Sequence, residues 1–153
     1  MTLKTLLLSA GLAVLAMPAA AEIAAWMSGE WRTNARLTAP DGAQLRIRCT
    51  LEAAAASASD WTGTLGCATV QGRFTGEWQI AITGGSASGQ VVFSGAASDV
   101  VAVSGTASDA RVDLASGDGQ GVAFAPGTDG ALIVEMQALG PQRLTGALSF
   151  EPR

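Results

Sequence analysis

The sequence predicts a single all-β domain, an antiparallel up-and-down barrel or flattened barrel of about eight to ten strands. Apolar and polar residues alternate over short segments, which is the pattern of a strand with one buried face. Gly, Asp and Pro interrupt these segments at intervals of about ten residues, as is typical of a barrel or sandwich. Because the connections are short, strands that follow one another in the chain are expected to pair.

Length and composition agree with one domain and disfavour several classes of function. The chain has 153 residues, of which 48% are hydrophobic and 14% are charged, whereas intrinsic disorder requires low hydrophobicity and high charge. The formal net charge of −4 disfavours a nucleic-acid partner, since contacts with phosphates need clustered lysine and arginine. Histidine, the usual general base and metal ligand, is absent.

Residues 1–21 are expected to form a secretory signal peptide. A basic start at Lys4 is followed by an apolar run that ends before Pro18, and small residues up to Ala21 form a cleavage pattern. The run is too short to cross a bilayer. We therefore expect cleavage after Ala21, no membrane span, and a periplasmic or extracellular domain over residues 22–153. Lys4 is the only lysine, so its removal changes the formal net charge from −4 to −5.

Strands are expected along the whole of the remaining chain. Residues 30–37 and 44–52 predict a hairpin around the turn signal at 41–42. The next two strands place Trp61 and Trp78 on their apolar faces. The later strands are expected at residues 90–96, 100–106, 110–115, 121–125, 131–138 and 142–151.

Two segments are expected to depart from the strand pattern. Residues 22–28 are short and rich in Ala, which predicts either one helical turn or a loose N-terminal arm. Residues 52–59 have good helix propensity, but an isolated helix of this length is marginal. A loop of small residues is an equal alternative for this second segment.

The only two cysteines, Cys49 and Cys67, are predicted to form a disulfide. An even number of cysteines in an exported chain favours a structural bridge, and alternation places both on the buried side of their strands. The alternative is a redox or metal pair, but there is no CxxC motif and no histidine. A bridge that closes this loop would stabilise the fold by roughly 3 kcal/mol.

The motif Gly29-x-Trp31 opens the first predicted strand and Arg143 opens the last. This arrangement resembles the calycin barrels, which include lipocalins, avidins and small bacterial metalloprotease inhibitors. The resemblance implies that Trp31 lies at the closed end of the barrel and that an Arg of the last strand packs over it, because a guanidinium stacks well on an indole. The alternative is a core Trp31 and a solvated Arg143 at a sheet edge.

Within that group, the bacterial protease inhibitors are the most similar in size, export and single disulfide. They act through an N-terminal segment that enters the protease cleft, and residues 22–27 correspond to that segment here. The overall texture, with Arg-x-Arg-Cys at 46–49 followed by a Gly-rich meander, also resembles small exported bacterial β proteins without an assigned function.

Catalysis has little support in the sequence. Without histidine, and without lysine once the leader is removed, nucleophilic triads and Ser-Lys pairs are excluded. A pair of carboxylates, as in glycoside hydrolysis, is the remaining arrangement. Glu30, Glu77 and Glu135 lie in predicted strands, but Glu30 and Glu77 precede tryptophans and are therefore expected to face outward.

Metal and cofactor sites have equally little support. Asp109, Asp113 and Asp118 could supply oxygen ligands, but they lack the spacing of a calcium loop. We interpret them as turn residues and expect no metal and no cofactor.

The tryptophans carry much of the large apolar area. Trp61 and Trp78, together with Gly29, Trp31 and Arg143, are candidates either to close the barrel or to line a pocket for an apolar ligand, and packing is the simpler expectation. The sequence thus predicts an exported, non-enzymatic binding or inhibitor module that takes a protein partner such as a protease, or a small apolar ligand. The alternative is a structural or surface-interaction protein with a filled barrel. The oligomeric state stays open.

Overall fold

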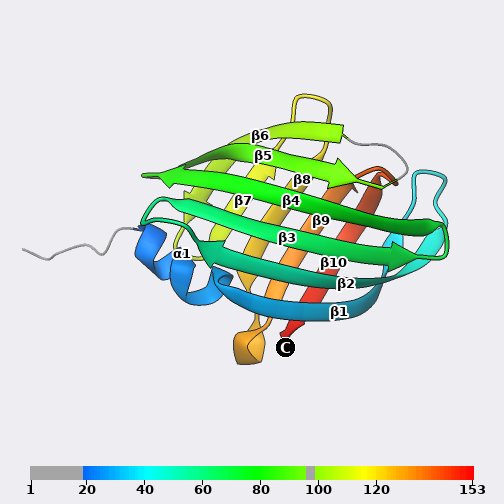
Figure 1. Cartoon of the computed structure of the whole chain (residues 1–153), viewed down its shortest axis with the longest axis horizontal. Helices are drawn as coiled ribbons and strands as arrows, with labels where there is room; N and C mark the ends of the chain where they lie inside the picture. Colours follow the sequence, from blue (N-terminus) through cyan, green and yellow to red (C-terminus); the bar gives the residue numbers. More distant parts are fainter. Residues whose placement is uncertain (1–18, 96–98) are drawn as a thin grey trace, which may run out of the picture.

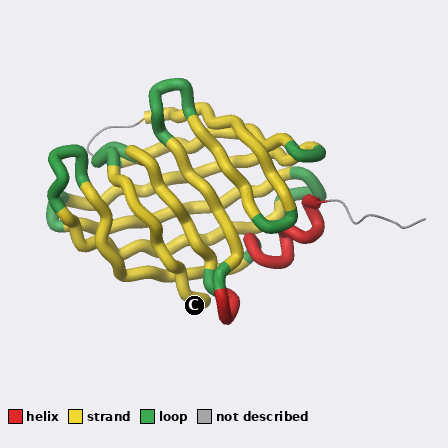
Figure 2. The backbone as a smooth tube through the Cα atoms, turned by 180° about the vertical axis from the view of Figure 1, so that it is seen from behind, coloured by secondary structure: helices red, strands yellow, loops and turns green. Residues whose placement is uncertain are grey.

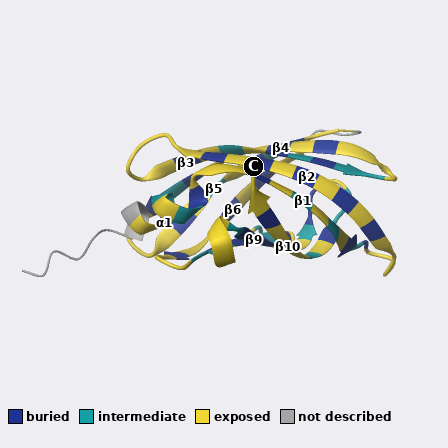
Figure 3. Cartoon of the chain, turned by 90° about the horizontal axis from the view of Figure 1, so that it is seen from below, coloured by how far each residue is buried: buried dark blue, intermediate teal, exposed yellow. Residues whose placement is uncertain are grey.

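The computed structural model describes residues 19–95 and 99–153, so most of the predicted signal peptide lies outside the described residues. Ten antiparallel strands close into one barrel, in which each strand pairs with its neighbours in the chain and β1 pairs with β10 (Figure 1). The barrel is flattened into two layers (Figure 3). The prediction of a closed up-and-down barrel is confirmed.

A short helix precedes the strands, and one 3₁₀ turn interrupts them. The elements are α1 (Ala19–Met27), β1 (Gly29–Thr38), β2 (Gln44–Ala55), β3 (Asp60–Thr69), β4 (Gly72–Thr83), β5 (Ser86–Ser94), β6 (Asp99–Ser108), β7 (Arg111–Ala115), β8 (Gly121–Pro126), η1 (Thr128–Gly130), β9 (Leu132–Leu139) and β10 (Leu144–Pro152). None of the described helices is long and apolar enough to cross a membrane.

The alternation of the sequence becomes the inside and the outside of the barrel. Along β2 the burial pattern is strictly alternating from Leu45 to Ala53, and β4 alternates in the same way from Phe74 to Ile82. The apolar set points inward and forms one continuous core, while the polar set covers the outer wall. This arrangement buries apolar area on one face of every strand, which is the main favourable contribution to folding.

The strand β2 is longer than the sequence predicts. Residues 52–55 continue as strand, because Ala53 pairs with Gly29 on one side and with Gly63 on the other. Pairing on both edges therefore overrides the helix propensity of the Ala run. Only residues 56–59 form the connecting loop.

The predicted disulfide is present and joins two directly paired residues. Cys49 and Cys67 lie opposite each other on β2 and β3, with their Cα atoms 4.2 Å apart. Both are buried in the core. The bridge therefore ties the barrel wall together at the centre of the β2–β3 ladder.

The N-terminal helix packs on one end of the barrel (Figure 2). Ile23 and Met27, four residues apart on one helix face, are completely buried, and α1 contacts β2, β6 and β8. The Trp26 indole Nε1 donates a hydrogen bond of 2.7 Å to the carbonyl oxygen of Asp109 in the β6–β7 turn. Of the segment 22–28, expected to be one turn or a loose arm, residues 22–27 are thus part of a docked helix.

Candidate functional site

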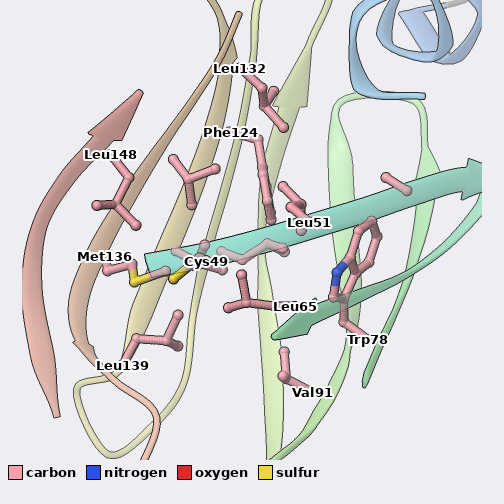
Figure 4. Packing of buried hydrophobic residues seen from close by; sticks show 14 of the residues in the cluster. Cys49, Leu51, Leu65, Trp78, Val91, Phe124, Leu132, Met136, Leu139 and Leu148 are labelled. Atoms are coloured by element: carbon pink, nitrogen blue, oxygen red, sulfur yellow. The ribbon is translucent and has the colours of Figure 1, made fainter. Parts of the chain in front are cut away.

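The barrel interior is filled by side chains (Figure 4). The void found inside has a volume of only about 30 Å³ and is lined by apolar residues that include Trp78, Phe93 and Met136. A site for a small organic ligand needs a cavity of about 300–1,000 Å³. The void described inside the barrel is far smaller than the cavity that such an apolar ligand would need.

Trp61 and Trp78 are packing residues in this core. Trp61 is 1% exposed and Trp78 is 5% exposed. Neither indole nitrogen has a hydrogen-bond partner among the described residues. Trp78 lies against Gly63, where an added Cβ would come within 2.1 Å of the indole carbon Cζ2. Because a buried donor without a partner costs about 1–3 kcal/mol, the indoles are retained here for their volume and not for polar recognition.

Gly29 and Trp31 lie at the end of the barrel that α1 covers. Trp31 is buried, and its Nε1 donates a hydrogen bond of 3.2 Å to the Gly130 carbonyl oxygen in the β8–β9 connection. Gly29 has a φ of +152°, and an added Cβ there would lie 3.2 Å from the Trp31 ring. Trp31 therefore helps to close this end of the barrel.

Arg143 lies at the opposite end, so the expected stacking of Arg143 on Trp31 is wrong. Trp31 pairs with Pro152 at the end of β10, whereas Arg143 precedes the start of that strand. Since β1 and β10 are antiparallel, a residue that opens β10 cannot reach one that opens β1. The Arg143 guanidinium instead lies 3.5 Å from the carboxylate of Asp118.

The predicted acidic candidates do not assemble into one site. Asp109 lies in the turn at the α1 end, and Asp118 lies in the β7–β8 turn at the other end. The Ser116 hydroxyl donates a hydrogen bond to Asp118 and, as the largest cause, lowers the pKa of its carboxyl group. We find no cluster of three or more metal-ligating side chains in residues 19–95 and 99–153.

Glu135 is engaged in an ion-pair network on the outer wall of β7–β9. Arg111 Nη2 donates to the Glu135 carboxylate at 2.7 Å, and Arg111 Nε donates to Asp113 at 2.9 Å. The hydrogen bond from Arg111 lowers the pKa of Glu135. Glu30 and Glu77 lie on other strands, β1 and β4. Both are exposed on the outer wall, as the alternation of the sequence predicts.

One depression of the described surface lies on the outer wall over β2, β3 and β4. It has a volume of about 660 Å³. Its floor is β3, whose outward residues Gly66 and Ala68 are small. Arg48 on β2 and Arg73 on β4 stand on either side of Ala68 in the same row, and Arg32 lines it from β1. We call this depression, with these five residues, the arginine groove.

The arginines of this wall have no ion-pair partner among the described residues. Within the described residues, the arginines that form salt bridges are Arg111 and Arg143, and neither lies on this wall. Beside the groove, Arg36 on β1 lies directly opposite Arg46 on β2. Like charges directly opposite each other in a sheet destabilise it. Arg36 and Arg46 therefore contribute nothing favourable to the fold, whereas Arg32 lies directly opposite Glu151 of β10, which also lines the groove.

A row of glutamates crosses the same wall nearer to the α1 end. Glu30, Glu52 and Glu77 share one row of the sheet, with Thr64 between the last two. All three are exposed. We call Glu30, Glu52 and Glu77 the glutamate row. The wall thus has one basic region and one acidic region on the same strands.

The sequence prediction missed this wall, although the signal for it is present. The pattern Arg-x-Thr-x-Glu occurs at residues 48–52 and again at 73–77. The β2–β3 and β3–β4 registers place these two copies side by side in the same direction, with Thr50 and Thr75 flanking Gly66. The repeated pattern could have been found by inspection, but its alignment depends on the pairing of three strands.

No protein-family model matches this sequence, and no curated protein matches it significantly. The site is therefore interpreted from its own geometry.

Proposed function

We propose that this chain is a non-enzymatic binding module that takes acidic groups of a partner protein into the arginine groove. The observation that carries the proposal is the groove itself, in which Arg32, Arg48 and Arg73 surround a floor of small residues and have no described ion-pair partner. The filled interior supports it as well, since it leaves the outer wall as the surface for recognition.

Carboxylates are the groups that this groove suits best. A guanidinium is planar and presents parallel N–H donors, so it binds a carboxylate through two hydrogen bonds. Arg48 and Arg73 offer such donors from opposite walls, and the hydroxyls of Thr50 and Thr75 lie one row further along. Gly66 has no side chain and Ala68 has only a methyl group, so a partner's side chain can reach the floor of the groove between Arg48 and Arg73.

The inhibitor form of the hypothesis receives less support. Segment 22–27 would have to leave the barrel to enter a protease cleft, yet Ile23 and Met27 are buried and Trp26 is hydrogen-bonded to the β6–β7 turn. We retain the calycin resemblance as a proposal about architecture, supported by the closed meander and the position of Trp31, and opposed by the position of Arg143.

Export to the periplasm or the cell exterior is part of the proposal. The Cys49–Cys67 disulfide supports it, because such bridges persist in oxidising compartments. Cleavage after Ala21 would remove the first three residues of α1 and leave Ile23 and Met27, which are buried, in the mature chain. The N-terminal sequence of the exported protein tests this directly, and a start other than Glu22 would overturn the cleavage site.

Filling the groove tests the proposed function without changing any charge. An added Cβ at Gly66 meets only the Thr50 hydroxyl, at 3.4 Å, so Gly66→Leu is expected to fold and to fill the floor. Gly117, in the β7–β8 turn, has open space around an added Cβ, so Gly117→Leu is a matched control. Both variants are compared with the unchanged protein for binding of a fluorescent oligoglutamate peptide at low salt.

We expect the unchanged protein and Gly117→Leu to bind the peptide equally, and Gly66→Leu to bind it at least about tenfold more weakly, a difference of about 1.4 kcal/mol. Binding should weaken as salt is added, because exposed charges are screened. Equal binding by Gly66→Leu, with the fold retained by circular dichroism, would overturn the groove as the site. Absence of binding by the unchanged protein, measured at a protein concentration at which it sediments as a monomer, would overturn the recognition of carboxylates.

A further inference from the structure

The two Arg-x-Thr-x-Glu columns of the outer wall are complementary to themselves. On β2, Arg48 and Glu52 lie two residues to either side of Thr50. On β4, Arg73 and Glu77 lie in the same way about Thr75. Thr50 and Thr75 share one row with Gly66 between them. The four charges of these two columns are therefore placed symmetrically about a single row of the sheet, with Arg32 of β1 at the end of that row.

We propose that the partner of the arginine groove is a second copy of this chain, bound face to face through β2, β3 and β4. This inference rests on the proposed function, since it assigns the carboxylates that enter the groove. The two-fold axis lies between the two sheets, along the row of Thr50, Gly66 and Thr75 and across the strands. Rotation about it brings Arg48 and Arg73 of one copy over Glu52 and Glu77 of the other.

Such a rotation forms each type of contact twice, as a two-fold interface requires. Arg48 of either copy faces Glu52 of the second copy, and Arg73 of either copy faces Glu77 of the second copy. A two-fold axis along the strands would instead place like-charged rows over each other. The charge pattern therefore favours one orientation of the two copies and opposes the other.

These charges cannot satisfy one another within a single chain. Arg48 and Glu52 are four residues apart on one strand, which is about 13 Å at a rise of about 3.3 Å per residue. That separation is consistent with the absence of these residues from the salt bridges of the described chain. A second copy supplies the opposite charge without any rearrangement of the strands.

The row on the proposed axis suits close contact between two sheets. Sheets that pack face to face lie about 10 Å apart, and small uncharged side chains at the centre let two walls that carry long arginines approach to that distance. Gly66 lies on the axis with a threonine on each side, and Ala68 and Thr64 complete the outward side of β3 around it. Arg32 lies in the same row, directly opposite Thr50, and Glu151 of β10 lies directly opposite Arg32. The rotation brings the two Arg32 side chains together at the edge of the face, where Glu151 of each copy supplies the opposite charge.

Charge reversal provides a test in which two defective variants restore each other. One variant, Arg48→Glu with Arg73→Glu, makes both regions of the face acidic. The other variant, Glu52→Arg with Glu77→Arg, makes both regions basic. Sedimentation velocity at low salt measures the mass of the full exported chain, of each variant, and of their equimolar mixture, after circular dichroism has shown that each variant is folded.

We expect the unchanged chain to sediment as a dimer at low salt and to dissociate at high salt. Each variant alone should be monomeric, with dimerisation weakened at least about tenfold, whereas the mixture should form a heterodimer. In that heterodimer every reversed position faces an opposite charge. Gly66→Leu should also be monomeric, because it separates the sheets at the axis.

A monomeric unchanged chain, or a dimer that none of these variants weakens, would overturn this inference. So would a mixture of two folded variants that stays monomeric. Sedimentation tests the dimer and oligoglutamate binding tests the groove, so the two proposals can fail separately. If the unchanged chain is monomeric but still binds oligoglutamate through Gly66, the groove stands and its partner is another acidic protein. If oligoglutamate binding also fails, both are wrong.

Discussion

Replacement of Arg46 by glutamate should stabilise the fold while it weakens binding. Arg46 lies directly opposite Arg36 in the β1–β2 ladder, and neither arginine has a salt bridge among the described residues. A cross-strand pair of opposite charges contributes about 0.2–1 kcal/mol, and a like-charged pair costs a similar amount. Arg46→Glu converts one into the other, so the free energy of unfolding should rise by about 1 kcal/mol. In a domain of this size the melting temperature should rise by about 3–5 °C.

Urea unfolding followed by tryptophan fluorescence measures this change. The gain should be present at low salt and should shrink at high salt, because both side chains are exposed. Arg153→Glu, at the chain end beyond β10, changes the net charge equally and serves as the control. Oligoglutamate binding should weaken in Arg46→Glu and not in the control. If Arg46→Glu is no more stable than the unchanged protein at low salt, these arginines do not repel each other as argued.

Three further predictions concern the frame of the site. Gly63→Ala should destabilise the fold by about 1–3 kcal/mol in urea unfolding, because its Cβ would overlap the Trp78 indole; unchanged stability would mean that the ring does not rest there. Replacing Cys49 and Cys67 by serine should cost roughly 3 kcal/mol for a loop with a sequence separation of 18, and a much smaller loss would contradict the chain-entropy argument. Glu135 has a lowered pKa in the folded chain, so its ionised form stabilises the fold above about pH 4.3 and less as the pH falls below that value. Glu135→Gln should thus lower stability at pH 7 and have little effect near pH 3; an equal effect at both would refute the ion pair as its cause.

Much of the barrel could be predicted because the alternation of apolar and polar residues along each strand shows which side chains face the core. Alternation along β2 and β4 placed Cys49 and Trp78 in the core without any knowledge of their partners. The end of β2 was not predicted, because Ala53 belongs to a strand only through its pairing with β1 and β3. The docking of α1 depends on the barrel end into which Ile23 and Met27 pack. That end is formed by strands distant in the sequence, so the sequence of α1 alone could not predict the docking.

The candidate site was harder to predict, because it exists only across strands. A net charge of −4 averages over the whole chain and hides the local arginines. Arg48 and Arg73 become neighbours of Ala68 only once the registers of β2, β3 and β4 are known. The position of Arg143 was predictable in principle. In a closed meander with an even number of strands, the start of the last strand lies opposite the start of the first.

The central claim is that recognition takes place on the outer wall and not inside the barrel. Amide chemical shifts of the isotope-labelled protein, recorded while oligoglutamate is added at low salt, test it most directly. We expect the amide shifts of Thr50, Gly66, Ala68 and Thr75 to change, and those around the core void at Phe93 to stay unchanged. Changes confined to the core or to α1, or no changes at all, would contradict it.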